Sequence, residues 1–296
     1  MAVSQMPRTF TTTHVVSTDE LNGLGAPNRC DGRLTLTSAT PVTTADVTGA
    51  GTIYFTPYKG NEVALFDGTQ WISYEFTERS LALTLTAANV YDVFLYNNAG
   101  TLTLETLIWT NATTRATALV LQDGILCKTG ALTRRYLGTI YASGTNTTED
   151  SITKRYVWNY YNRVPRVMYA VESTASWAYN TTSWRASNNS TVERLNFVVG
   201  VSEDAITAEA ITFSNCTSAS NHFTSIGLDS TTSPYGPISR TGVAAGGYGS
   251  TTCVVNAIST AVGFHYLQKM EKAETSTTTW YGTAASGSCI TARVFA

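Results

Sequence analysis

Charged side chains are scarce in this 296-residue sequence, where they make up 14% of the chain against about 25% in an average soluble protein. The 19 Lys and Arg residues nearly balance the 21 Asp and Glu residues, so the net charge is −2. This balance excludes the basic surface expected of a protein that binds duplex nucleic acid. Long hydrophobic runs are also missing, and since a membrane helix needs roughly 20 apolar residues, we expect no membrane insertion.

Histidine and paired cysteine are equally scarce. The chain has three His residues, none at H-x-x-x-H or H-x-H spacing, and five Cys residues without a C-x-x-C pair. This spacing predicts neither a metal site nor a bound cofactor, and we expect the cysteines to be free thiols packed as small apolar side chains. No G-x-S-x-G motif is present, so we expect a non-enzymatic protein, and a glycan-degrading hydrolase is the weakest hypothesis.

The residues that are abundant indicate a folded protein with a polar, uncharged surface. Hydrophobic residues make up 43% of the sequence and aromatic residues 11%, which is enough to form a core. Thr, Ser and Asn take the place of the missing charges. Residues 1–10 contain one Arg and no apolar segment, so we expect no secretory signal there.

Short alternating segments separated by turns dominate residues 41–145. Residues 81–86 and 91–96 alternate apolar with polar positions, and Asp67-Gly68 is a strong hairpin signal. Turns every 8 to 12 residues are typical of an antiparallel sandwich or barrel. The pattern returns in residues 167–296 with longer polar loops, which favours a jelly-roll-like C-terminal β-sandwich.

Two segments depart from this all-β pattern. Residues 1–40 have little material for a core of their own, and we expect an extended N-terminal arm that anchors the chain to other proteins. Residues 146–166 combine charged with aromatic residues and predict a connector that packs against both flanking domains or against a neighbouring subunit. Helix and strand are equally compatible with the connector.

Two sets of candidate binding residues follow from these patterns. Exposed aromatic rings beside Asn and Thr are suited to bind uncharged sugars, and aromatic residues in polar, loop-like segments are Trp177, Tyr179, Trp184 and Tyr235. The alternative is that these rings fill the core or subunit interfaces. Arg and aromatic residues around the connector are candidates for subunit contacts, with a solvated surface as the alternative: Arg134, Arg135, Arg155, Tyr156, Trp158, Tyr160 and Arg163.

Residues 45–166 also carry strings that point to a known group of proteins. The runs GTIYFTPYKGN (51–61) and RYVWNYYNR (155–163) resemble a domain of structural proteins of tailed bacteriophages. The C-terminal runs FHYLQ (264–268) and TTWYG (278–282) are similar to the ends of comparable phage surface proteins. The resemblance implies a fibre, tail-appendage or capsid-decoration protein that is β-rich, non-enzymatic and a homotrimer.

The resemblance and the composition lead to two functional hypotheses. In the first, the chain is a structural protein of the virion surface, made in the host cytoplasm and bound to other virion proteins through its arm. In the second, it is a receptor-binding adhesin whose C-terminal domain grips host glycans. A position on the head and a position on the tail are equally compatible with the sequence.

Overall fold

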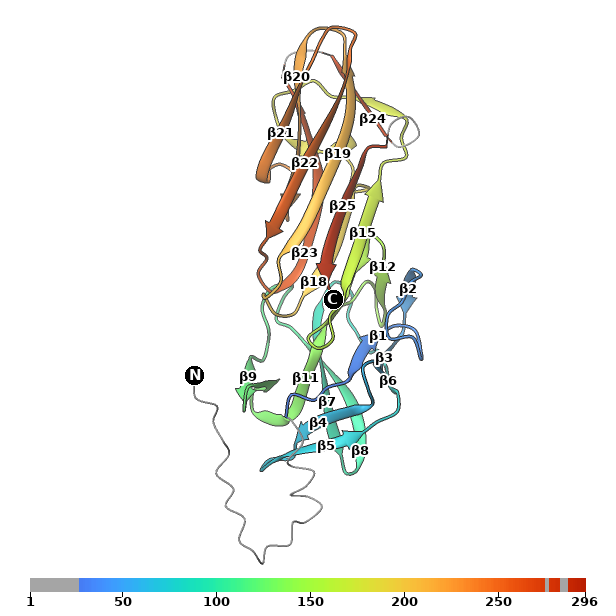
Figure 1. The fold of residues 1–296 in the computed structure, drawn as a ribbon, viewed down its shortest axis with the longest axis vertical. Coiled ribbons are helices and arrows are strands. Elements are labelled where there is room, and N and C mark those ends of the chain that lie inside the picture. The colour runs from blue at the N-terminus through green and yellow to red at the C-terminus, as the bar shows by residue number, and fades with distance from the viewer. Residues whose placement is uncertain (1–26, 275–276, 283–286) are drawn as a thin grey trace, which may run out of the picture.

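The computed structural model describes residues 27–274, 277–282 and 287–296, and within these residues the fold is all-β, as predicted. Strands make up 59% of the structure, and a three-residue 3-10 helix, Ser187–Asn189, is the one helical element that the described residues contain. No helix among them is long and apolar enough to cross a membrane. Figure 1 shows an elongated molecule with the C-terminal sandwich above the N-terminal half.

The N-terminal half contains a three-stranded sheet in the order β1-β3-β6, the hairpin β4-β5 and a sheet in the order β8-β7-β11-β10-β9. Its strands are β1 (Gly32–Thr35), β2 (Val47–Ala50), β3 (Thr52–Pro57), β4 (Glu62–Phe66), β5 (Trp71–Glu75), β6 (Arg79–Ala82), β7 (Val90–Asn98), β8 (Thr101–Ile108), β9 (Leu119–Gln122), β10 (Ile125–Lys128) and β11 (Ala131–Tyr141). Apolar side chains of both larger sheets, including Leu34, Phe55, Val93 and Leu137, enclose one core. This half is therefore the sandwich-like domain that the alternation predicts.

Strand β1 corrects the predicted extent of the N-terminal arm. It pairs with β3, and Leu34 is buried in the core of the N-terminal half. Residues 32–35 therefore belong to the first domain, because β1 pairs with its sheet and Leu34 packs in its core. Residues 1–26 of the predicted arm lie outside the described residues.

The C-terminal half is a sandwich of two mainly antiparallel sheets, which confirms the predicted architecture. One sheet has the order β15-β25-β19-β24-β16 with β22 beside β19, and the other contains β18-β23-β20-β21 with β17 beside β23. The strands are β15 (Pro165–Val171), β16 (Ser176–Ala178), β17 (Arg185–Ala186), β18 (Arg194–Val199), β19 (Ile206–Cys216), β20 (Ser220–Leu228), β21 (Tyr235–Val243), β22 (Tyr248–Ile258), β23 (Gly263–Ala273), β24 (Thr278–Tyr281) and β25 (Cys289–Phe295). Met168, Ile290, Phe197 and Leu267 meet in the core between them.

The connector is built of strands that join the two halves. It contains β12 (Thr148–Ser151), β13 (Lys154–Arg155) and β14 (Val157–Asn159). Strand β12 pairs with β2 of the N-terminal half, β13 pairs in parallel with β18 of the sandwich, and β14 pairs with β11. The open choice between helix and strand is thereby decided for strand. One eight-stranded sheet runs from β2 through β12 and β13 into the sandwich, so the two halves share backbone hydrogen bonds.

A buried charge cluster reinforces this junction. The Asp150 carboxylate accepts hydrogen bonds from Arg155 at 2.9 Å and from Arg166 at 2.9 Å, and a further one from the Thr43 hydroxyl at 3.1 Å. Arg155 also donates to the backbone carbonyl of Val167. The two guanidinium groups come from the connector and from the first sandwich strand, so Asp150 connects both to its own strand β12.

The core of the sandwich holds further buried charges on strand β23. Lys269 pairs with Glu193 at 2.8 Å, and both side chains are almost fully buried. Glu271, on the same side of the strand, pairs with Arg185 at 2.7 Å. Burial raises the pKa of Glu271 from 4.5 to about 7, although the Arg185 charge and the hydrogen bond from Trp177 act in the opposite direction.

Asp150→Ala is predicted to destabilise the protein strongly. The substitution leaves the Arg155 and Arg166 guanidinium groups buried without their counter-charge, which costs about 3–5 kcal/mol of unfolding free energy. Chemical denaturation of both proteins measures the difference. Lys154→Ala is the control, because Lys154 is 40% exposed in its pair with Glu149 and such a pair contributes less than about 1 kcal/mol. Equal losses in the two variants would contradict the role of Asp150.

The raised pKa of Glu271 predicts a pH dependence of stability. Between pH 4.5 and about 7 the folded protein keeps this proton while the unfolded chain releases it. Stability therefore falls as the pH rises through this window, by up to about 1.4 kcal/mol per pH unit. Glu271→Gln removes the titration. The unfolding free energy of the wild type minus that of the variant, measured from pH 5 to pH 8, should decrease, and a constant difference would contradict the assignment.

Candidate functional site

Two of the four predicted sugar-binding residues, Trp177 and Tyr179, are half-buried and have partners within the sandwich. The Trp177 indole, on β16, donates from Nε1 to both carboxylate oxygens of Glu271, at 3.0 and 2.9 Å. The Tyr179 ring lies 3.6 Å from the Arg185 guanidinium carbon, and its hydroxyl donates to the Ser183 carbonyl at 2.8 Å. The structure brings these two residues together around the Arg185–Glu271 pair, where they support a buried ion pair rather than offer free rings.

The other two predicted sugar-binding residues lie in different surroundings. Trp184 makes an edge-to-face contact with Phe223 on β20, with 6.4 Å between ring centroids. The Lys272 amine lies 5.7 Å from the same Trp184 ring. Tyr235, on β21, packs against the main core. For these rings the alternative of core filling and local packing describes the structure better than a common sugar site.

The residues predicted to form subunit contacts interact with other residues of the same chain. Arg135, Arg155, Tyr156 and Trp158 are buried, which leaves them no surface to offer to another subunit. Arg135 donates to the Ala64 carbonyl at 2.6 Å. Their burial fits neither the predicted subunit contact nor the solvated surface that is the alternative for these residues. The physical reason is that the connector strands pair with strands of both halves, so side chains around them pack within the chain.

The three half-buried members of that set also have partners in the same chain. Arg163 pairs with Glu203 at 2.7 Å and with Asp204 at 3.1 Å, so these adjacent carboxylates form an ion pair across the junction. Arg134 pairs with Glu105 at 3.2 Å. Tyr160 packs against the buried Tyr136 ring, 5.7 Å away between centroids. All seven residues therefore stabilise the fold of a single chain.

A buried Ser–His pair lies in the sandwich core. The Ser214 hydroxyl and His222 Nδ1 are 2.6 Å apart, and His222 Nε2 faces the Thr278 hydroxyl at 3.2 Å. Burial lowers the pKa of His222. A serine nucleophile needs an accessible hydroxyl and an oriented base, with a carboxylate as third member in the usual triad. Ser214 and His222 are fully buried, and a threonine takes the place of the carboxylate, so this pair supplies core hydrogen bonds.

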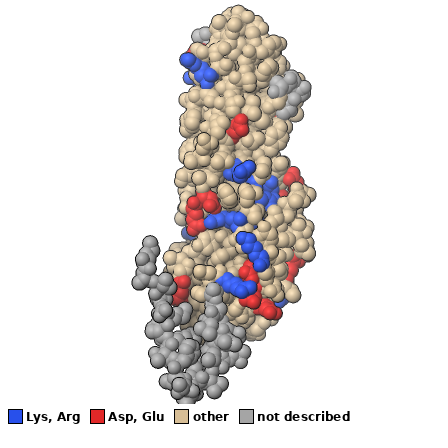
Figure 2. Space-filling view, in the orientation of Figure 1, with Lys and Arg blue, Asp and Glu red and all other residues tan. Residues whose placement is uncertain are grey.

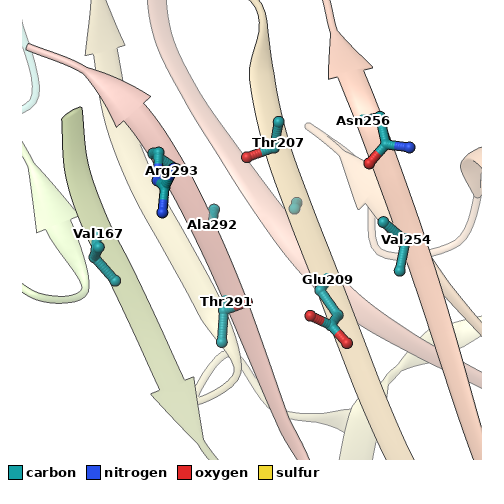
Figure 3. A pocket seen from close by; sticks show the side chains of 9 residues that line it. Val167, Thr207, Glu209, Val254, Asn256, Thr291, Ala292 and Arg293 are labelled. Atoms are coloured by element: carbon teal, nitrogen blue, oxygen red, sulfur yellow. The ribbon is translucent and has the colours of Figure 1, made fainter.

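The outer face of the β15-β25-β19-β22 sheet forms a shallow groove of about 360 Å³. Figure 3 shows its side chains arising from these four adjacent strands. The strand register places Val167 beside Arg293, and Arg293 beside Thr207. The next row along the strands includes Thr291, Glu209 and Val254. On this face the central strands β25 and β19 carry Thr291 and Thr207 beside the longer Arg293 and Glu209.

This face exposes apolar side chains and few charges. Val167 is 53% exposed and Val254 is 45% exposed. Tyr169 on β15 and Phe295 on β25 are also exposed. Figure 2 shows few charged side chains on the part of this face over the sandwich, whereas charges gather around the middle of the molecule. Among the residues that the structure describes, neither Glu209 nor Arg293 has an ion-pair partner.

Three aromatic rings occupy the far end of the same face, at a distance from the N-terminal half. Phe213 on β19 lies directly across from Tyr281 on β24, and Tyr248 on β22 lies diagonally beside Phe213. The ring centroids are 5.5 to 6.0 Å apart. We call Phe213, Tyr248 and Tyr281 the aromatic triad. Sequence reasoning missed it because the three residues are far apart in the chain, and only the strand register brings them together.

Comparisons with known proteins leave the family of this chain open. No protein-family description matches it, and no curated protein matches it. Among the described residues, no group of three or more His, Cys, Asp or Glu side chains is arranged to hold a metal ion.

Solved structures offer weak likenesses. The insecticidal delta-endotoxin Cry8Ea1 from Bacillus thuringiensis shares 5% identity over 90% of this chain and 51% of its own, with a TM-score of 0.26. A Cry1Da tryptic core variant from Bacillus thuringiensis shares 5% identity over 79% of this chain and 48% of its own, with a TM-score of 0.19. The chain spans about half the length of these toxins, and similarity at this level carries no functional argument.

Proposed function

We propose that the chain is a non-enzymatic structural protein on the surface of a tailed-phage particle, where it acts as a homotrimer. The observation that carries the proposal is the outer face of the β15-β25-β19-β22 sheet, whose exposed apolar side chains surround a shallow groove. Exposed apolar patches of this kind mark interaction sites in soluble proteins. The phage-like runs at 51–61 and 155–163 support the location on a virion.

The chemistry of this face favours a second copy of the same chain as its partner. Thr, Val and Asn side chains dominate the groove, so two copies approach without repulsion between like charges. The face also carries one acid, Glu209, and one base, Arg293, and in a head-to-tail contact the acid of one copy can meet the base of the next. Such a contact closes into a ring when the rotation between subunits is one third of a turn.

The remaining parts of the proposal concern the place of the trimer on the particle. The face runs along the length of the sandwich (Figure 1), which allows three copies to stand side by side around an axis near the strand direction. In this arrangement the N-terminal half lies at one end of the trimer. We propose that the segment 1–40 binds other virion proteins. Its strand β1 is anchored in the first domain.

The double substitution Val167→Arg/Val254→Arg is predicted to convert the trimer into monomers. Both side chains are about half exposed in the single chain, so the substitutions leave the fold intact while they place extra positive charge on both sides of the contact. Size-exclusion chromatography with light scattering at micromolar concentration measures the mass. The wild type is expected at three times the chain mass, and the variant at one.

Leu121→Arg is the matched control for this experiment. Leu121 is an apolar side chain with 63% exposure, but it lies on β9 in the N-terminal half. The control variant should remain trimeric. A monomeric wild type, or dissociation of the control to the same degree as the double variant, would overturn the assignment of this face. Density for the trimer on the head or tail in a particle reconstruction tests the location, and a particle without it would refute that part.

A further inference from the structure

The aromatic triad is a surface feature that the core does not require. Alternation along β19 and β24 directs Thr212, Ser214 and Trp280 into the sandwich, where they are buried. The triad side chains therefore point to the opposite, outer face. Tyr248 is 64% exposed, and exposed clusters of large apolar rings mark interaction sites in soluble proteins.

The geometry of the rings suits stacking. The Phe213 and Tyr248 rings are inclined by 14° at a centroid distance of 5.5 Å, and Tyr281 lies 5.8 Å from Phe213 and 6.0 Å from Tyr248. Strand pairing holds all three residues, since each belongs to a strand bonded to β19 or to β19 itself. The platform is thus held by backbone hydrogen bonds before any ligand arrives, which limits the entropy lost on binding.

The edge of the platform is polar and uncharged. Across the strands from the triad rings lie Asn215, Ser250 and Ser176, which supply hydroxyl and amide groups. Desolvation and the neighbouring Tyr248 raise the pKa of Tyr281 above its usual value, and a tyrosine hydroxyl is protonated at neutral pH in any case.

We propose that the aromatic triad binds a neutral oligosaccharide. The C–H face of a sugar ring stacks on the exposed Tyr248 ring, which Phe213 supports by stacking against it, and the hydroxyls of the sugar bond to the Tyr281 hydroxyl and to the polar groups at the edge. Stacking with hydrogen bonds at the rim matches a sugar, which has an apolar ring face and a polar periphery. The uncharged cross-strand neighbours disfavour acidic glycans and nucleic acid, because both need cationic partners.

The proposal is independent of the trimer, because the triad lies beyond the groove. The groove residue nearest to the triad on β19 is Glu209, which is four positions from Phe213, and this corresponds to roughly 14 Å at about 3.4 Å per residue. A contact between copies that is confined to the groove residues therefore leaves the rings accessible. Failure of one proposal does not imply failure of the other.

A panel of oligosaccharides tests the assignment on the full chain. The probes are maltohexaose, cellohexaose, N-acetylchitohexaose and neutral O-antigen chains, with sialylated and sulfated glycans as acidic counterparts. Glycan-array binding is followed by saturation-transfer NMR and titration with the strongest neutral binder. We expect at least one neutral probe to bind, with little change between 50 and 500 mM salt. Binding of no neutral probe, or salt-sensitive binding of acidic probes alone, would overturn the proposal.

Variants of the most exposed ring locate the site. Tyr248→Ala should weaken binding about tenfold or more because it removes one stacking surface, whereas Tyr248→Phe should retain binding within about threefold. Tyr58→Ala is the matched control, since Tyr58 is an exposed tyrosine of the N-terminal half, and it should bind as the wild type does. Thermal unfolding checks that each variant is folded. Unchanged binding in Tyr248→Ala, or loss of trimers in place of loss of binding, would refute the site.

Discussion

Asp150 lies between two guanidinium groups in the buried middle of the molecule, at 2.9 Å from Arg155 and 2.9 Å from Arg166. The two arginines belong to the strands that leave the N-terminal half and enter the sandwich. Removal of Asp150 leaves two buried guanidinium groups without their counter-charge, which is far costlier than the net benefit of the intact cluster. The cluster therefore penalises any arrangement in which the two halves separate. Together with the sheet that continues from β2 to β18, it links the two halves by both ion pairs and backbone hydrogen bonds.

The surface carries even fewer charged side chains than the composition suggests, because several charged residues are buried. Several of the few charged residues lie inside the protein, among them Asp92, Arg135, Asp150, Glu193, Lys269 and Glu271. Each is retained with a partner, as the Lys269–Glu193 and Arg185–Glu271 pairs show. Much of the sandwich surface is therefore formed by Thr, Ser and Asn together with exposed apolar side chains. Such a surface suits contacts with neutral partners, whether another copy of the chain or a sugar.

Sequence patterns predict the strands of this fold better than their partners. The run at 91–96 predicts β7 correctly, although residues 90–95 are all buried, because most of its residues are β-favouring apolar or aromatic side chains. No such run marks β12, which is buried although its four residues are polar or charged, and β14 has only three residues. Charged residues such as Asp150 and Arg155 favour an exposed position in a sequence-based prediction. Both are nevertheless buried, because they pair with each other. Charge indicates exposure only where no opposite charge is folded against it.

Contacts between residues that are far apart in the sequence also explain why the candidate sites could not be predicted from local patterns. Trp177 stands in a polar segment, yet its indole is drawn inward by Glu271, which lies 94 positions later in the chain. Phe213, Tyr248 and Tyr281 are separated in sequence and meet only through the register of β19 with β22 and β24. A sheet face thus carries functional information that no local window contains. If three copies associate along the groove, one assembly carries three aromatic triads. Linked sites of modest individual affinity then bind a repetitive polysaccharide far more tightly than one site does, because each bound site raises the effective concentration of the next.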